Sequence, residues 1–179
     1  MGDAIAKVIF GDYNPGGKLA VTFPRSVGQI PFAFPFKPGS DSKGFVRVTG
    51  PLYPFGYGLS YTTFDYSALK IENPVIGTQG SVKLSCRVKN TGKIAGDEVV
   101  QLYLHDEVSS VTTYVKVLRG FERIHLQPGE EKVVDFVLTP QDMGLWNKDN
   151  HFIVEPGTFA VMVGSSSQDI RLQGKFEVK

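Results

Sequence analysis

The chain has 179 residues, which suffices for one large all-β domain or for one domain of ordinary size joined to part of another. Its 19 Lys and Arg residues nearly balance its 18 Asp and Glu residues, so neither nucleic acid nor an anionic membrane surface is expected as a partner. The single cysteine, Cys86, excludes an internal disulfide, and it lies in an alternating apolar run where we expect a small core side chain.

The sequence contains no recognisable targeting or membrane signal. No apolar run reaches the roughly 18 residues of a membrane span, and no basic and apolar leader is present. Met1 and Gly2 lead directly into what resembles the middle of a domain. We therefore expect the natural protein to begin further upstream, and the location of the protein stays unknown.

The first 31 residues predict a helix, a turn and a strand. Asp3 is suited to begin a short helix that Gly11 would end. Turn-forming residues then precede an alternating run, 18–23, which Pro24 stops. One helix and one strand cannot close a core, so we expect them to belong to an α/β sheet whose other members are absent from this chain.

Residues 24–50 predict a long loop, because prolines and glycines recur there without a helical or strand period. Its aromatic residues favour an arm that wraps over a neighbouring domain rather than a loop that contacts a ligand; they are Phe32, Phe34, Phe36 and Phe45. The next stretch, 51–66, is also dense in aromatic residues. It predicts a connector that lies on a surface rather than a flexible tether.

From Phe64 onward the apolar residues alternate with polar ones, which is typical of β-strands. The expected strands, separated by turn residues, are 64–71, 81–89, 97–105, 115–126, 132–138, 158–164 and 170–178. We expect the third of these to turn Val100, Leu102 and Leu104 inward, and the fourth to bend at Gly120. About seven strands with no helix between them predict a fibronectin type III or immunoglobulin-like β-sandwich, so the chain is mainly β.

The reactive residue types do not form a recognisable site in the sequence. The three histidines, His105, His125 and His151, lack a second histidine or a cysteine at metal-ligand spacing. The acid pairs, such as Asp97 and Glu98, are interpreted as solvated charges at strand ends, because neighbours on a strand point to opposite faces. We therefore predict no catalytic residue, no metal site and no cofactor.

Ordered motifs run along the whole chain. The first group comprises Phe10–Leu19, Thr22–Pro31 and Leu52–Phe64, and the second comprises Val88–Gly92, Gly96–Tyr103, Leu118–Phe121, Pro128–Glu130 and Glu155–Gly157. In this order they closely resemble the end of the α/β sandwich domain, the linker and the C-terminal fibronectin type III-like domain of family 3 glycoside hydrolases, the β-glucosidases and β-xylosidases. Residues 34–50 resemble the family least.

The resemblance implies retaining hydrolysis of β-glycosides by an Asp nucleophile and an acid/base carboxylate, which lie about 5 Å apart in such enzymes. Both would precede Met1, so no residue of this chain inherits either role. We expect an accessory, scaffolding part of such an enzyme that is inactive alone, with the missing N-terminal catalytic domains as its partner. The resemblance is compatible with a secreted or periplasmic parent.

We accordingly divide the chain into the end of an α/β domain (1–31), an extended aromatic-rich arm and connector (32–60) and the sandwich (61–179). Candidate sugar or interdomain contacts are Tyr53, Phe55, Tyr57, Tyr61 and Trp146. We expect the first three on the α/β side of the connector, and Tyr61 and Phe64 on the sandwich. Two alternatives stay open: a module that binds oligosaccharide through these aromatic faces, and a protein-interaction module or self-association through the exposed edge.

Overall fold

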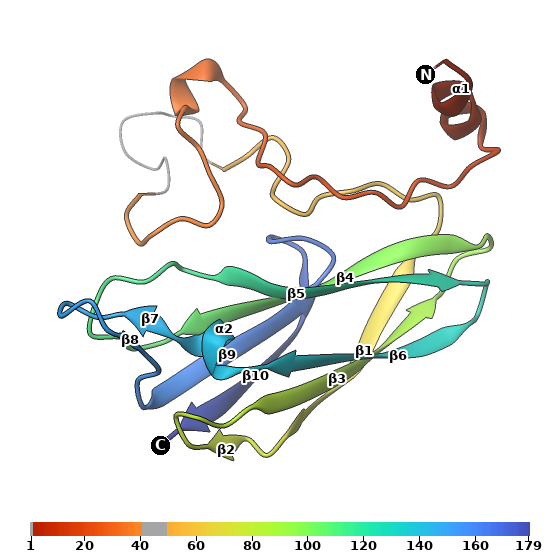
Figure 1. Ribbon diagram of the computed structural model, residues 1–179. Helices are drawn as coiled ribbons and strands as arrows, with labels where there is room; N and C mark the ends of the chain where they lie inside the picture. Colours follow the sequence, from red (N-terminus) through yellow and green to blue (C-terminus); the bar gives the residue numbers. More distant parts are fainter. Residues whose placement is uncertain (1, 41–49) are drawn as a thin grey trace.

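The computed structural model describes residues 2–40 and 50–179, and most of these residues form a β-sandwich (Figure 1). The strands are β1 (Phe64–Glu72), β2 (Val75–Ile76), β3 (Val82–Asn90), β4 (Gly96–Asp106), β5 (Val117–Leu126), β6 (Glu131–Leu138), β7 (Leu145–Trp146), β8 (Phe152–Ile153), β9 (Gly157–Gly164) and β10 (Ile170–Val178). The helices are α1 (Gly2–Phe10), the 3-10 turn η1 (Val27–Gln29) and α2 (Pro140–Met143). None of the helices in this described part is long and apolar enough to span a bilayer.

Two sheets form the layers of the sandwich. One has the order β1-β3-β6 and the other the order β2-β10-β9-β4-β5, while β7 and β8 form a separate small ribbon. All paired strands are antiparallel except β2, which runs parallel to β10. The described residues include seven strands of eight or more residues, and each covers a predicted strand to within two residues at either end. The predicted fold class is confirmed.

The core lies between the two sheets and follows the predicted alternation. On β3 every second side chain is buried, including Cys86, while Lys83 and Arg87 are exposed. On β4 the predicted inward residues Val100, Leu102 and Leu104 are buried as well. Because side chains alternate between the two faces of a strand, the apolar residues at every second position all face the core. Burial of these apolar side chains supplies the main driving force for the fold.

The predicted bend in the fourth strand is a β-bulge on β5. Leu102 pairs with Gly120 and Tyr103 pairs with Leu118, so Arg119 is the extra residue that has no opposite partner. A side chain at Gly120 would crowd the Phe136 ring of the facing sheet. The glycine therefore allows the two sheets to approach each other at the bulge.

Two short helices flank this framework. The predicted helix is confirmed as α1, which ends before Gly11, whose φ of +84° is left-handed. The helix buries none of its side chains, and Phe10 is exposed. The second helix, α2, contradicts the expectation of strands without a helix: Thr139 and Asp142 form a hydrogen-bonded cap over a single turn after β6.

The segments before β1 lie over the outer face of the larger sheet. Figure 1 shows residues 12–24 and 50–61 running over β4 and β5, while the loop that contains η1 rises away from the sheet. Phe45, predicted to belong to the wrapping arm, lies outside the described residues. These segments, together with the sheet face beneath them, form the candidate functional site.

Candidate functional site

Two extended segments, 18–23 and 52–57, lie side by side at the centre of the site. Leu19 exchanges backbone hydrogen bonds with Gly56 and Tyr57, both of 2.8 Å, and Phe23 exchanges bonds with Leu52 and Tyr53. Only Phe23 and Tyr53 form a regular bridge, so the strand predicted at 18–23 is wrong as a regular element. Its partner segment cannot complete a ladder, because Pro54 has no amide hydrogen and Gly56 has a φ of +79°.

The connector is fastened to the outer face of β4 by buried polar groups. The side-chain nitrogen of Gln101 donates hydrogen bonds to the carbonyl oxygens of Gly56 (3.2 Å) and Ser165 (2.6 Å). The Tyr103 hydroxyl donates to the Gln101 side-chain oxygen at 2.5 Å, and burial raises the pKa of Tyr103. Gln101 is 3% exposed and Tyr103 is 0% exposed although they point away from the core, so the connector and arm cover the outer face of β4 while the core covers its inner face.

The wrapping arm adds aromatic contacts to this fastening. Phe34 stacks on Phe55 with ring centroids 4.8 Å apart, and it meets the edge of Tyr103 at 5.7 Å. The backbone amide of Ser167 also donates to the carbonyl oxygen of Phe55 at 2.9 Å. Phe55 therefore faces the sandwich, and our expectation that it lies on the α/β side is wrong. It lies on the side of the connector opposite to Tyr53 and Tyr57.

An ion pair joins the N-terminal segment to the sandwich. The Lys18 ammonium lies 2.8 Å from Glu98 Oε1, and both side chains are largely buried. The interpretation of Glu98 as a solvated charge is therefore wrong. Its neighbour Asp97 faces the solvent side, where it contacts Arg123 and lies 2.6 Å from His125 Nδ1. Partial burial alone would raise the pKa of Asp97, but these hydrogen bonds outweigh burial and lower it.

A buried tyrosine hydroxyl lies near this ion pair. Tyr66 OH has no hydrogen-bond partner within the described chain, and burial together with Glu98 raises the Tyr66 pKa. Both residues line a polar hollow of about 270 Å³, beside the bidentate pair of Arg171 and Asp169. Glu98, Asp169 and Arg171 in this hollow are held by ion pairs or hydrogen bonds to other side chains.

The second half of the connector is linked to the N-terminal segment by Asn14. Its side-chain nitrogen donates to the carbonyl oxygen of Ala95, and its oxygen accepts from Tyr61 N at 2.7 Å and from Ser60 Oγ. The Tyr61 hydroxyl donates to Val8 O of α1 at 2.8 Å. Tyr61 thus contacts the helix, and its expected place on the sandwich is wrong, whereas Phe64 is buried in the sandwich core as expected.

The opposite side of the connector carries an open apolar surface. Tyr53 and Tyr57 stack with ring centroids 5.0 Å apart, and Phe23 meets Tyr53 edge-on at 6.1 Å. Together with Leu19 and Leu59 they line a shallow hollow of about 490 Å³. We call these five residues the aromatic patch. No protein segment in the described part of the chain covers it, so Tyr53 and Tyr57 are available for an interdomain contact or for another ligand.

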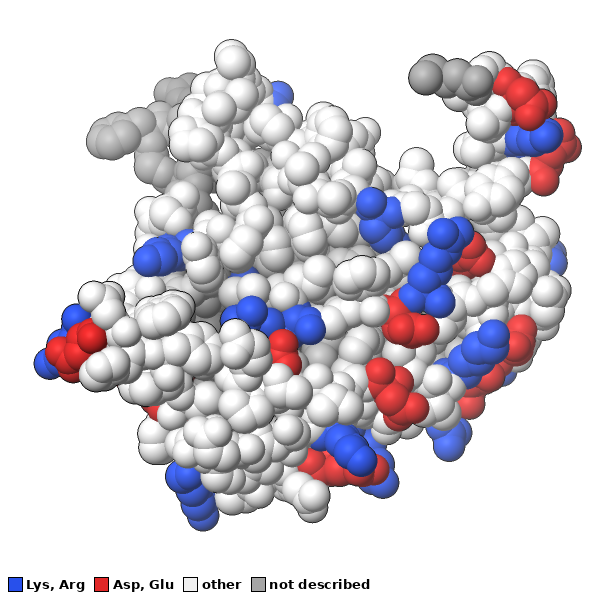
Figure 2. All heavy atoms as spheres, viewed as in Figure 1, with Lys and Arg blue, Asp and Glu red and all other residues white. Residues whose placement is uncertain are grey.

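Among the described residues, more than half of the large hydrophobic side chains that are exposed lie within residues 5–61, although this region is about one third of the chain. Figure 2 shows the same asymmetry on one face: the segments above the sandwich are mostly uncharged, apart from α1, while charged side chains gather over the strands. Monomeric surfaces rarely leave so much apolar area open. The exposed apolar side chains of the described residues are thus concentrated in the segments before β1.

The remaining candidate, Trp146, does not join this site. It lies on β7, packs edge-on against Phe152 and lines a separate pocket. Among residues 2–40 and 50–179 no three His, Cys, Asp or Glu side chains lie close enough to hold a metal ion.

Sequence reasoning did not identify Asn14, Lys18, Gln101 and Tyr103 as anchors. One signal was present on β4: its outward positions 101 and 103 are uncharged, whereas those of β3 carry Lys and Arg. An outward face without charges indicates a covered sheet face.

The comparisons with known proteins agree with this arrangement. Residues 1–61 match the sequence profile of the glycosyl hydrolase family 3 C-terminal domain, and residues 98–167 match that of the fibronectin type III-like domain. The chain corresponds to a C-terminal portion of the family 3 glycoside hydrolases. The boundary between the two matched regions falls in the connector and the first strands of the sandwich.

The chain spans only about a quarter of the length of the curated relatives it matches. A beta-xylosidase of Formosa agariphila is 50% identical over 93% of this chain, and a periplasmic beta-glucosidase of Salmonella typhimurium is 46% identical over 99% of it. The chain spans 24% of the length of each. Among solved structures, a β-glucosidase from Erythrobacter marinus is 44% identical with a TM-score of 0.93, and one from Listeria innocua is 35% identical with a TM-score of 0.89. The alignments cover 99% of this chain and 24% and 26% of those chains.

Proposed function

We propose that this chain is an accessory, scaffolding part of a retaining β-glycosidase that acts on β-glucosides or related β-glycosides. Its relatives are β-glucosidases and β-xylosidases, and it corresponds to their C-terminal portion. The catalytic carboxylates would belong to the N-terminal portion of such an enzyme. This chain would hold that portion in place and stabilise it.

One observation carries the proposal: the segment before β1 has two different sides. One side is fastened to β4 through Gln101, Tyr103 and the Lys18–Glu98 pair. The other side presents the aromatic patch and the exposed apolar face of α1 to solvent. A layer that is fixed to the sandwich and apolar outward suits a docking face for the catalytic portion.

The first test is enzymatic. The chain alone is assayed with p-nitrophenyl β-D-glucopyranoside and p-nitrophenyl β-D-xylopyranoside, and we expect no turnover above the buffer rate. Retaining hydrolysis needs a nucleophilic carboxylate and an acid/base carboxyl group across one scissile bond, and by the family resemblance both would lie in the N-terminal portion of the parent enzyme. Turnover comparable to that of a full-length relative would overturn the proposal.

The second test concerns docking. The chain replaces the matching portion of the Salmonella typhimurium β-glucosidase, and the chimera is compared with its Leu59→Asp variant. Leu59 is exposed in this chain and would be covered by the catalytic portion, so a buried carboxylate should lower the melting temperature and the activity of the chimera. The control is Val108→Asp, in an exposed loop of the sandwich, which should change neither. Equal effects of the two substitutions would count against the docking face.

The same surface predicts the behaviour of the isolated chain. We propose that uncovered apolar side chains drive weak self-association through the aromatic patch. Light scattering after size exclusion should show a mass that increases with concentration, and Leu59→Asp should restore a monomer. A monomer at all concentrations would exclude self-association.

A further inference from the structure

A second cavity lies away from the aromatic patch, at the end of the sandwich where β4 and β5 are joined. It has a volume of about 320 Å³, within the roughly 300–1,000 Å³ range of small-molecule sites. Leu104, Met143 and Phe159 form an apolar floor that is continuous with the core. The family resemblance explains the connector and the sandwich, but it assigns nothing to this cavity.

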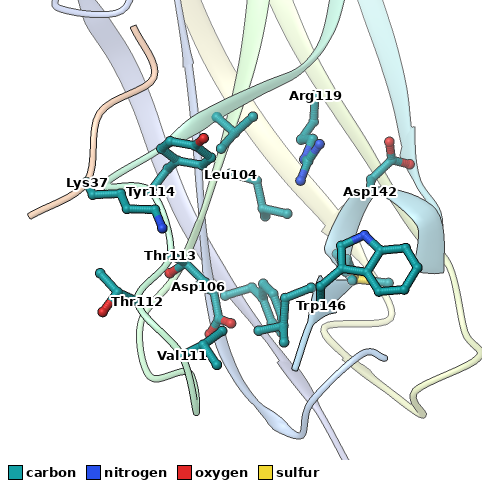
Figure 3. Close-up of a pocket in the computed structure, with 15 residues that line it drawn as sticks. Lys37, Leu104, Asp106, Val111, Thr112, Thr113, Tyr114, Arg119, Asp142 and Trp146 are labelled. Carbon is teal, nitrogen blue, oxygen red and sulfur yellow. The ribbon is translucent and has the colours of Figure 1, made fainter. Parts of the chain in front are cut away.

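The rim of the cavity combines aromatic and charged side chains. Figure 3 shows Trp146 and Asp142 on one side, Lys37 and Tyr114 on the other, and Arg119 directed between them. Trp146 is 65% exposed, and its edge-on contact with Phe152 at 5.6 Å holds the ring while leaving a face free. Such an exposed, oriented indole is the kind of platform on which an apolar ring face packs.

The β-bulge on β5 places Arg119 at the cavity. As the extra residue of the bulge it has no opposite partner in the ladder, and bulges commonly redirect a side chain in this way. No hydrogen bond or ion pair holds its guanidinium within the described chain, although Asp142 attracts it electrostatically. The guanidinium N–H donors of Arg119, which lines the cavity, are therefore free to bind a ligand there.

Two carboxylates that can accept hydrogen bonds, those of Asp142 and Asp106, line the same cavity. Asp142 uses one carboxylate oxygen, Oδ2, for the cap of α2, where it accepts from Thr139 at 2.7 and 2.8 Å, and no described group donates to its other oxygen. Asp106 lines the opposite wall, and burial raises its pKa. The two basic side chains of the cavity, Lys37 and Arg119, balance the charges of its two acidic ones. This balance favours an uncharged ligand with many hydroxyl groups over an anion or a cation.

The arm closes one wall of the cavity. The amide of Val115 donates to Phe36 O at 3.0 Å, and the Lys37 ammonium lies 5.9 Å from the centre of the Tyr114 ring. The cavity is therefore assembled from the arm, the β4–β5 loop and the segment from α2 to β7. Three parts of the chain that are far apart in sequence meet here.

We propose that this cavity binds one neutral pyranose unit, with an apolar sugar face on Trp146 and hydroxyl groups on Arg119 and Asp142. Hydroxyl groups both donate and accept, so a sugar satisfies the guanidinium and the free carboxylate oxygen together. If the proposed scaffolding role holds, a sugar unit bound in this cavity would raise the local concentration of a saccharide substrate at the parent enzyme.

Trp146 makes the proposal directly measurable, because it is the only tryptophan of the chain. Its fluorescence is followed while the full chain is titrated with methyl β-D-glucopyranoside, and in parallel with methyl β-D-xylopyranoside, sodium D-glucuronate and sorbitol. We expect a saturable change with a neutral pyranoside, with a dissociation constant on the order of 1 mM. Glucuronate and the open-chain sorbitol should bind at least about tenfold more weakly.

Variants separate binding at this cavity from a general solvent effect. Arg119→Met keeps the fluorophore and should weaken pyranoside binding at least about tenfold, whereas its control Arg87→Met, on the outer face of β3, should bind like the parent chain. Trp146→Ala, followed by titration calorimetry, should lose the heat of binding, and its control Phe10→Ala should retain it. No saturable response to either pyranoside, or equal binding by Arg119→Met, would overturn the proposal. A stronger response to glucuronate would show an anion site instead.

Discussion

The ammonium group of Lys18 lies 2.8 Å from Glu98 Oε1, and this ion pair joins the N-terminal segment to strand β4. Glu98 also accepts a hydrogen bond from the amide of Val99 at 2.8 Å. The two partners are 80 residues apart (98 − 18), and both side chains are largely removed from water. Each charge has therefore lost hydration, which is replaced mainly by the opposite charge and, for Glu98, also by the Val99 amide.

Removal of one partner should be costly. In Lys18→Met the Glu98 carboxylate stays buried without a cation, and we expect the free energy of unfolding to fall by about 3 kcal/mol. Urea unfolding followed by circular dichroism measures the loss. The control Lys7→Met removes the exposed pair with Asp3 on α1 and should cost no more than about 0.5 kcal/mol. The double variant Lys18→Met with Glu98→Gln should recover part of the loss; an unchanged midpoint for Lys18→Met would refute this role.

Asn90 should be intolerant of substitution, because its side chain is 0% exposed and fully hydrogen-bonded. Its nitrogen donates to the carbonyl oxygens of Ile94 (2.8 Å) and Leu126 (3.0 Å), and its oxygen accepts from Thr62 Oγ1 at 2.7 Å. Asn90→Ala leaves these groups unpaired and should destabilise the sandwich by about 3 kcal/mol. Asn90→Asp, which keeps the shape but loses both donors, should not rescue stability. Near-native thermal melting of either variant would contradict the prediction.

Gly56 and Gly129 allow steric and backbone effects to be separated. Both have a φ of +79°, but only at Gly56 would a methyl group overlap the side chain of Gln101, while the space around Gly129 is open. Gly129→Ala should cost about 1 kcal/mol from backbone strain alone. Gly56→Ala should cost clearly more, because it also displaces the Gln101 fastening of the connector. The urea unfolding midpoints of the two variants are compared. Equal losses of stability would mean that the overlap between the new methyl group and Gln101 is relieved without cost.

The thiol of Cys86 should react only when the sandwich opens. The side chain is 1% exposed, and burial raises the pKa of Cys86 to about 11. A disulfide reagent at pH 8 should leave the folded chain unlabelled and label it fully in urea. A control cysteine at the exposed position Ser67, in a Cys86→Val background, should react at once.

The same shift predicts the alkaline limit of stability. The folded-state pKa is raised, so the contribution of the thiol is fully present below the unfolded value of about 8.5 and is lost as the pH rises toward 11. The free energy of unfolding should therefore fall over this window in the parent chain. The fall should be smaller in Cys86→Val, which has no thiol to ionise; identical pH profiles would contradict the prediction.

The elements that the sequence predicted well are those in which neighbours along the chain decide the outcome. Alternation of apolar residues predicted the seven long strands, and the turn at Gly129 and the helix end at Gly11 followed from residues that tolerate positive φ. The alternating run 18–23 failed because a strand also requires a regular partner, and its partner contains Pro54 and Gly56.

By itself the sequence determined the β-sandwich, its inward faces, the aromatic connector and the family, because periodicity and ordered motifs are local properties of the chain. Only the tertiary structure decided that β4 is covered on both faces, that Phe55 and Tyr57 point to opposite sides, and that Glu98 is buried against Lys18. It also decided that Trp146 and Arg119 border one cavity. These contacts join segments that are far apart in the sequence and share no repeating pattern of apolar residues. Their geometry depends on how irregular loops pack on the folded sheet.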